Sequence, residues 1–262
     1  MKVTVLGCSG GIGAGRAGAR TTALLVDDDM LIDAGTGVGD LGREALARID
    51  RVFVTHTHID HVACLPLIMD AVGERRAAPL VVHCTRDTEA ALREHLFNDR
   101  LWPDFTRIPD AARPFLRFAA LEVGEPVACD HPVHGARTIV ALPAEHTVPA
   151  VGYRLDGARG SLAFSGDTTV CGAFADALAR IGSLRHLIVE TAFPDAQRDL
   201  ARASKHLCPS LLAELLAAED PRFELWITHI KPGAERETMR ENRALLRRFR
   251  PKRLARGHVF DF

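Results

Sequence analysis

The stretch "VTHTHIDH", residues 54–61, ends an apolar run typical of a buried strand and carries four side chains that bind metal ions. His56 and His58 are two residues apart, so in extended backbone they project to the same side. Asp60 and His61 follow where we expect the chain to turn into a helix. Neutral imidazoles beside a carboxylate suit zinc, with iron or manganese as alternatives. Burying four such polar side chains only to fill a core would cost too much free energy. The stretch therefore predicts a metal site at the end of a strand.

Three further candidates end strand-like runs later in the chain. His146 ends "TIVALPAEH", Asp167 ends "SLAFSGD" and His229 ends "LWITH". Taken alone, a histidine at a strand end is usually a surface or hydrogen-bonded residue, and an aspartate before threonine is usually a turn or helix cap. Taken together with the first stretch, these residues predict one metal site assembled from several loops.

The apolar periodicity predicts short strands with antiparallel pairs early in each half of the chain and strand–helix alternation later. "DDD" at 27–29 is expected to form a tight turn. The predicted strands are 2–6, 22–27, 30–33, 51–55, 80–84, 138–146, 150–155, 161–167, 186–191, 225–229 and 253–258. A helical stretch is expected between 55 and 80, and further helices at 172–181, 206–219 and 234–249. This pattern predicts two sheets with helices packed outside.

Composition argues against some classes of partner. The 262 residues carry 33 basic and 34 acidic side chains, so no overall field recruits nucleic acid or an acidic membrane surface. The basic run "RRFRPKRLAR", 247–256, could face RNA, but basic residues at a helix end usually face solvent, and we favour solvent. No apolar stretch approaches the length of a membrane span, and no leader precedes the first strand pattern. Six cysteines, scattered singly, suit free thiols in a reducing cytoplasm.

"THTHIDH" followed by His146, Asp167 and His229 in that order resembles the metallo-β-lactamase fold superfamily. The resemblance covers nearly the whole chain. It implies an α/β fold, a four-layer αββα sandwich, formed by a single domain over 1–262 with an irregular insert at about 92–118 that walls the substrate pocket. It further implies that Asp167 bridges two divalent metal ions, one held by His56, His58 and His146 and the other by Asp60, His61 and His229. One carboxylate between two cations would fix their separation near ~3.5–4 Å.

Finer motifs resemble the class II cyclic-nucleotide phosphodiesterases, although Ile59 stands where that family usually has leucine and Cys64 where it usually has glycine. The motifs are "HLFNDRLWPDF" (95–105), "HTVPAVGYRL" (146–155), "SGDT" (165–168), "IVETAFP" (188–194), "SKHLCP" (204–209) and "ITHIKP" (227–232). The resemblance implies hydrolysis of a small phosphodiester, such as a 3′,5′-cyclic nucleotide, by a metal-bridging hydroxide.

By the same resemblance, Asp60, Asp167 and His206 are the catalytic residues. His206 is expected to protonate the leaving oxygen or to stabilise charge at phosphorus, because an imidazole changes charge near neutral pH. The alternative is a histidine that caps the helix predicted at 206–219.

Three residues are candidates for substrate contact. Lys231 could pair with phosphate or with a surface carboxylate. Asn98 and Trp102 could wall the pocket, since an indole stacks on a nucleobase, with ordinary packing as the alternative. We interpret the remaining histidines as structural: His83, His95, His131, His134, His186 and His258. The expected partner is a small molecule rather than nucleic acid or a membrane, and a homodimer is the default oligomer.

Other hydrolytic functions use the same metal motifs. A tRNA 3′ processing endonuclease is the first alternative, but that family usually adds a long flexible arm, and no Gly/Pro-rich insertion of that kind is present. A thioester or lactam hydrolase is the second, because the metal site does not choose the substrate. A metal-binding module without turnover is harder to reconcile with Asp167 and His206 beside a full ligand set.

The opening "VTVLGCSGGIGAG", residues 3–15, imitates a dinucleotide-binding turn, because Gly7, Gly11 and Gly13 have the GxxxGxG spacing. That fold requires a helix directly after the glycines, and a parallel crossover needs a dozen or more residues. The nine residues "AGRAGARTT", 14–22, are too few. The glycines therefore predict a loop at the rim of the metal site, whose backbone N–H groups could meet a phosphate.

Overall fold

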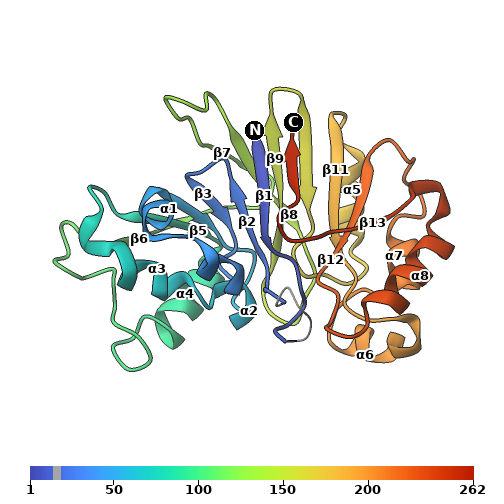
Figure 1. Cartoon of the computed structure of the whole chain (residues 1–262), viewed down its shortest axis with the longest axis horizontal. Helices are drawn as coiled ribbons and strands as arrows, with labels where there is room; N and C mark the ends of the chain where they lie inside the picture. The colour runs from blue at the N-terminus through green and yellow to red at the C-terminus, as the bar shows by residue number, and fades with distance from the viewer. Residues whose placement is uncertain (14–18) are drawn as a thin grey trace.

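The strands of the computed structural model, which describes residues 1–13 and 19–262, form two mixed sheets packed face to face (Figure 1). Gly15 and Gly18 of the glycine-rich segment lie outside the described residues. The first sheet has the order β14 (Val259–Asp261), β1 (Lys2–Gly7), β2 (Ala23–Val26), β3 (Met30–Ile32), β4 (Arg51–Phe53), β5 (Leu80–Cys84) and β6 (Leu116–Ala120). The second has the order β13 (Lys252–Arg253), β12 (Glu224–Thr228), β11 (Leu184–Glu190), β10 (Gly160–Phe164), β9 (Val151–Gly157), β8 (Thr138–Pro143) and β7 (Pro126–Ala128).

Both sheets change from antiparallel to parallel pairing part of the way across. In the first sheet the pairs are antiparallel from β14 to β3 and parallel from β3 to β6. In the second they are antiparallel from β7 to β10 and parallel from β10 to β13. This is the predicted rhythm of early antiparallel pairs followed by strand–helix alternation, and the predicted turn at 27–29 joins β2 to β3.

Helices cover the two outer faces, which gives four layers. Figure 1 shows α1, α3 and α4 on one side of the strands and α5, α7 and α8 on the other. The helices are α1 (Arg43–Arg48), α2 (Ile59–Val62), α3 (Leu65–Val72), α4 (Arg86–His95), α5 (Gly172–Ala179), α6 (Arg198–Ala203), α7 (Pro209–Leu215) and α8 (Glu235–Leu245), with 3₁₀ turns at Thr36–Asp40, Gly73–Arg75, Asp195–Gln197 and Arg247–Phe249. The predicted αββα sandwich is confirmed.

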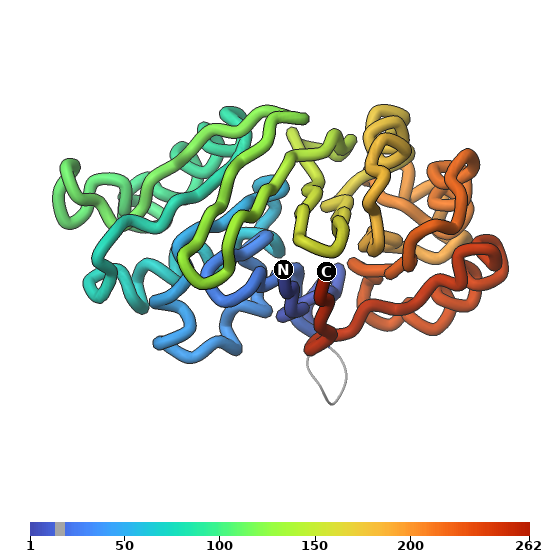
Figure 2. Tube along the Cα trace, turned by 90° about the horizontal axis from the view of Figure 1, so that it is seen from above, coloured from blue at the N-terminus to red at the C-terminus, as the bar shows by residue number. Residues whose placement is uncertain are grey.

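Three apolar cores separate the layers. The central core joins the sheets, with Val5 and Phe53 of the first facing Tyr153 and Phe164 of the second. A second core lies under α3 and α4, and a third under α5, α7 and α8. The chain ends also meet at the centre, where the Met1 amino group donates to the Phe262 carbonyl at 2.8 Å (Figure 2).

The structure corrects some predicted element boundaries. Strands β6, β7 and β14 were not predicted, and the strand predicted at 253–258 is only Lys252–Arg253, because the chain turns at Gly257 (φ 82°) and crosses to the other sheet. The helix predicted at 206–219 begins at Pro209, a residue suited to a first helical position. His206 therefore does not cap this helix, and that alternative is wrong.

Three other expectations concern the basic run, the cysteines and membrane-spanning helices. The basic side chains of 247–256 are exposed, and several of them pair within the fold: Lys252 with Glu224, Arg253 with Glu235, Arg256 with Asp40, and Arg248 with the carbonyls of the two residues that follow α7. Exposure is common to a solvated run and to a surface that faces RNA, so the interpretation as a solvated run stays a prediction. All six cysteines are free thiols, as expected. Among the described helices, none is both long and apolar enough to cross a bilayer.

Candidate metal centre

The "THTHIDH" stretch leaves the sheet directly after β4. His58 precedes the first residue of α2, and the turn into this short helix places Asp60 and His61 on the same side as His56. The side chains of His56 and His61 are fully buried, whereas that of Asp60 is 26% exposed. The stretch thus contributes two buried candidate ligands, His56 and His61, and two that are partly exposed, His58 and Asp60.

The remaining predicted ligands arrive from the second sheet. His146 follows β8, Asp167 follows β10 and His229 follows β12, and strands from both sheets end at the same edge of the sandwich. The donor atoms of these residues form two groups, and within each group all donor atoms lie within 4.8 Å of one another. One group comprises His56, His58, His146 and Asp167, and the other comprises Asp60, His61 and His229. The structure therefore brings together all seven predicted ligands, which we call the His/Asp cluster: His56, His58, Asp60, His61, His146, Asp167 and His229.

Asp167 lies at the centre of the His/Asp cluster. Its Oδ2 atom is 3.3 Å from Nε2 of His229 and 3.4 Å from Nε2 of His61. The corresponding distance to Nε2 of His56 is 3.7 Å, and Nε2 of His146 lies 3.2 Å from Nδ1 of His58. Two ligands of one tetrahedral zinc ion, each bonded at ~2.0–2.1 Å, are separated by about 3.3–3.4 Å. The spacing of the cluster is that of atoms sharing a cation.

Several inward-facing atoms lack any other partner. Among the described residues, Nε2 of His56, His61 and His229 and Oδ1 of Asp167 are buried without a hydrogen bond. Buried polar atoms are rarely left unpaired, so their convergence on one space requires an explanation. A divalent cation provides it, and this donor set of imidazole nitrogens and carboxylate oxygens fits such an ion.

The outward-facing ring nitrogens are held from behind. Nδ1 of His61 donates to Oδ2 of Asp33 at 2.7 Å, and Asp33 also accepts from the backbone N–H of Thr55 at 2.8 Å. Nδ1 of His146 donates to the carbonyl of Lys205 at 3.0 Å, and Nδ1 of His56 lies 3.0 Å from Oγ1 of Thr55. Such contacts fix the tautomer, so that the Nε2 lone pairs of these rings point into the cluster.

Burial keeps several of these imidazoles neutral. Desolvation lowers the pKa of His229 to about 3 and that of His146 to about 4, and it lowers the pKa of His56 well below its usual value. His61 differs: burial acts to lower its pKa, but the carboxylates of Asp167 and Asp33 raise it well above the usual value. Neutral imidazoles are the form that binds metal.

A histidine–glutamate pair adjoins the His/Asp cluster. His206 precedes α7, its ring centroid is 4.8 Å from that of His146 and 5.3 Å from that of His229, and its Nδ1 lies 2.8 Å from Oε1 of Glu190. Burial acts to lower the pKa of His206, but Glu190 raises it above the usual value. Glu190 ends β11 and also accepts from three backbone N–H groups, those of Thr168, Ala192 and Leu207.

Glu190 and Asp33 were missed by the sequence analysis. Each carboxylate comes at or directly after the end of a buried strand, in "HLIVE" and "MLID". This is the signal that identified Asp167. Their partners, His206 and His61, are far away in sequence, so only the fold reveals what the carboxylates hold.

The residues predicted to contact substrate have partners of their own. Nζ of Lys231 donates to the carbonyl of Gly10 at 2.9 Å. The side chain of Asn98 donates to the carbonyl of Glu94 and accepts from the N–H groups of Arg100 and Leu101. Trp102 packs against the core under α3 and α4. These contacts place Asn98 and Trp102 within the framework of the insert, and their contact with substrate stays a prediction.

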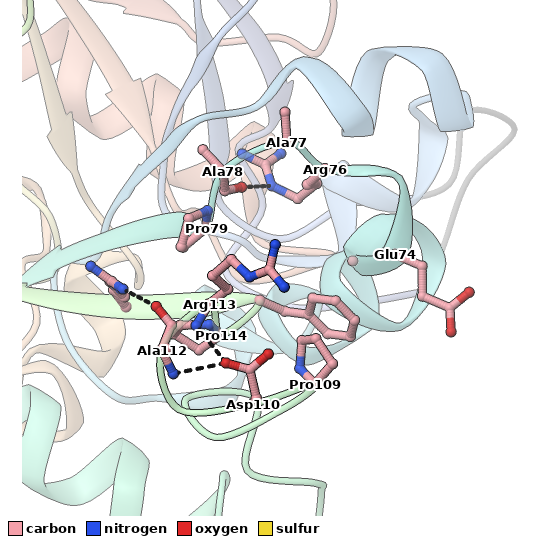
Figure 3. A pocket seen from close by; sticks show the side chains of 13 residues that line it. Glu74, Arg76, Ala77, Ala78, Pro79, Pro109, Asp110, Ala112, Arg113 and Pro114 are labelled. Carbon is pink, nitrogen blue, oxygen red and sulfur yellow. Dashed lines mark hydrogen bonds between the residues drawn. The ribbon is translucent and has the colours of Figure 1, made fainter.

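The insert also borders a separate hollow of about 390 Å³ (Figure 3). It lies between the segments Gly73–Pro79 and Pro109–Arg117. Arg76 and Arg117 are turned to the protein's own carbonyls, whereas Arg113 projects into the hollow. No described residue of its lining belongs to the His/Asp cluster.

The four layers and the cluster at their edge define a metallo-β-lactamase fold hydrolase. The chain belongs to the beta-lactamase superfamily, whose family model, described as "Beta-lactamase superfamily domain", matches residues 29–230. The resemblance to this superfamily is thereby confirmed, and the fold implies divalent metal ions.

Two relatives in sequence and one solved structure are similar to this chain over part or most of its length. A ribonuclease Z from Synechococcus sp. (strain WH7803) is 25% identical over 303 residues, covering 88% of this chain and 85% of that protein. A "probable 3′,5′-cyclic-nucleotide phosphodiesterase" from Yersinia pestis is 26% identical over 141 residues, 43% of this chain and 38% of that protein. The crystal structure of unliganded yeast PDE1 superposes with a TM-score of 0.80 at 17% identity, covering 98% of each chain.

Proposed function

We propose that this protein is a metal-dependent phosphodiesterase that hydrolyses a small diester such as a 3′,5′-cyclic nucleotide. The observation that carries the proposal is the Glu190–His206 pair beside the Asp167-centred cluster, because it adds a proton donor to a site for cations. The names of the ribonuclease Z and phosphodiesterase relatives also refer to cleavage of phosphodiesters, which supports this reaction class.

The cluster would hold two divalent cations, for which zinc is our first choice given the nitrogen-rich donor set. One would be bound by His56, His58 and His146 and the other by Asp60, His61 and His229, with Asp167 between them. When bound, such ions supply Lewis acidity to a phosphoryl oxygen and lower the pKa of water. The partly exposed ligands Asp60 and His58 would lie on the side from which substrate enters.

His206 would act as the general acid. Its Nδ1 is held by Glu190, so its Nε2 is free to donate a proton to the oxygen that leaves phosphorus. The buried carboxylate of Glu190 favours the charged imidazolium, which is the form that carries this proton. General acids of this kind contribute roughly 10²–10⁴-fold to rate.

A tRNA 3′ processing endonuclease is the second candidate function, favoured by the ribonuclease Z relative that covers most of the chain. The two candidates share the chemistry at phosphorus and differ in the size of the substrate. The deciding experiment compares turnover of cyclic AMP, cyclic GMP and a tRNA precursor by the protein loaded with Zn²⁺ or Mn²⁺, with Asp167→Asn as the inactive control. A lactam and a thioester belong in the same panel. Cleavage of these two alone would overturn the phosphodiesterase proposal.

A further inference from the structure

We propose that the N-terminal segment Cys8–Gly10, tethered by Lys231, is a clamp that positions His229 for metal binding. This inference rests on the metal-binding part of the proposed function and assigns a role to the glycine-rich opening of the chain. The segment lies beside the His/Asp cluster, at the end of β1, as the sequence analysis predicted for its glycines.

His229 needs such a clamp because its backbone is strained. Its φ is 58°, in the left-handed region that a residue with a Cβ adopts only at an energetic cost. This conformation turns the chain sharply after β12 and directs the imidazole towards Asp167, 3.3 Å away. The ring is held only loosely from behind, since Nδ1 lies 3.5 Å from Oγ1 of Thr22.

Backbone hydrogen bonds fasten the N-terminal segment to both sides of His229. The N–H of His229 donates to the carbonyl of Cys8 at 2.9 Å, and Oγ1 of Thr228 donates to the same carbonyl at 3.2 Å. On the other side, the N–H of Gly10 donates to the carbonyl of Ile230 at 3.1 Å. The strained residue, His229, thus lies between two backbone hydrogen bonds to the segment Cys8–Gly10.

Gly10 allows this approach because it has no side chain. A Cβ at this position would lie 2.3 Å from the carbonyl oxygen of His229 and 3.0 Å from Cδ2 of its ring. Both contacts are closer than van der Waals packing permits. Glycine is required here for contact with a metal ligand, rather than for the approach of a nucleotide. The N–H of Gly10 is also already used, so it is not free for the phosphate that the sequence analysis considered.

Lys231 closes the clamp. Its backbone N–H donates to the carbonyl of Ala192 at 3.0 Å, which anchors the residue to the chain after β11. From there its Nζ reaches back to the carbonyl of Gly10 at 2.9 Å. A charged donor makes this hydrogen bond stronger than a neutral one. Lys231 is therefore a positioning residue that keeps Gly10 against the imidazole of His229.

The test is metal retention by the full-length protein loaded with Zn²⁺, measured by chelator competition and metal analysis. Lys231→Met keeps the alkyl stem and removes the donor, and Lys231→Arg restores one. Lys252→Met is the matched control, because Nζ of Lys252 pairs with Glu224 at the opposite end of β12. Gly10→Ala tests the other half of the clamp, with Gly172→Ala as control because its Cβ would meet no atom within 4 Å.

We expect Lys231→Met and Gly10→Ala to release one of two Zn²⁺ ions at roughly 10-fold to 100-fold lower chelator concentration, as is typical when the support of a ligand is lost. Lys231→Arg should recover part of the affinity, and both control variants should behave like the unmodified protein. The melting temperature of the metal-free protein should be unchanged in Lys231→Met.

Two outcomes would overturn the clamp. If Lys231→Met retains both ions with full affinity and only raises KM, Lys231 contacts substrate instead. If it loses both ions equally together with the stability of the metal-free protein, Lys231 has only a general structural role. Metal retention and the melting temperature do not depend on the substrate, so a metal-loaded protein that cleaves no diester would reject the proposed function and leave the clamp standing.

Discussion

Nδ1 of His206 lies 2.8 Å from Oε1 of Glu190, and this contact joins a buried carboxylate to the imidazole nearest the candidate metal ligands. The positions of the two side chains distinguish a residue that can contact substrate from one that positions it, which the sequence alone did not do. His206 faces the cluster, whereas Glu190 lies behind it among backbone N–H groups. The first can touch a substrate, and the second can act only through its neighbour.

Replacement of His206 by alanine should reduce turnover of the best diester by roughly 10²–10⁴-fold, because the general acid is lost. Metal content should remain that of the unmodified protein, because His206 lies outside the predicted ligand set. Steady-state kinetics and metal analysis on the same preparation check both points. Loss of metal would contradict the acid role and make His206 a ligand, since its ring nitrogen lies within reach of Asp167 and His229.

Replacement of Glu190 by glutamine should also reduce turnover, by roughly 10²-fold or more, because a neutral amide no longer favours the imidazolium or fixes its tautomer. The amide should destabilise the fold by about 1–3 kcal/mol as well. Both carboxylate oxygens accept hydrogen bonds from backbone N–H groups, so the NH₂ group of glutamine must face at least one N–H that then lacks an acceptor. Chemical denaturation measures the second effect. Unchanged turnover with reduced stability would limit Glu190 to a structural role.

Replacement of Asp33 by asparagine should weaken metal binding about 10-fold to 100-fold, because the carboxylate that receives the Nδ1 proton of His61 raises the basicity of that ligand. Asparagine keeps an oxygen for the N–H of Thr55, so the protein should still fold. The matched control is Glu224→Gln, which alters a 3.3 Å carboxylate–imidazole contact to His186 away from the cluster. Equal metal affinity in the two variants would contradict the role of Asp33.

The members of the His/Asp cluster could be predicted from sequence because several of them follow the end of a strand, where the fold collects side chains at one edge, and Asp60 and His61 lie on α2 directly after the first of these strands. His56, His146 and Asp167 carry this signal locally. The supports could not be predicted, because they act through space: Asp33 reaches His61 across 28 positions, and Cys8 reaches His229 across the whole chain. A carboxylate or glycine has the same local pattern whether or not a distant partner meets it.

The missed strands have a related cause. β6 and β7 are edge strands, and β14 pairs only with β1 among the described strands, so one side of each is without a neighbour. Edge strands are short and carry polar residues, and their apolar alternation is weak. The run at 253–258 looked like one continuous strand, but Gly257 turns it from one sheet to the other. The turn brings β14 beside β1 in the first sheet, a pairing between the two ends of the chain that no local sequence pattern indicates.

His83, which the sequence analysis treated as structural, should make stability depend on pH. Its ring stacks on that of Phe53 at 4.5 Å, the residue is 9% exposed, and its Nε2 is buried without a hydrogen bond in the described structure. Burial, with a smaller effect of Arg51, lowers the pKa of His83 to about 4. Between pH 6.5 and 4 the unfolded chain therefore binds a proton that the folded chain does not, and stability falls as the pH falls through this window.

The expected size of the His83 effect follows from its pKa in the two states. An imidazole with a pKa of about 4 when folded and about 6.5 when unfolded loses about 2 kcal/mol of stability between pH 7 and pH 5. His83→Phe keeps the stack on Phe53 and removes the titration, so its free energy of unfolding should fall by about 2 kcal/mol less than that of the unmodified protein over this interval. His95→Phe is the matched control, because that side chain is 71% exposed. Denaturant unfolding at both pH values measures the difference, and parallel pH dependence of His83→Phe and the unmodified protein would show that the folded state accommodates a charged His83.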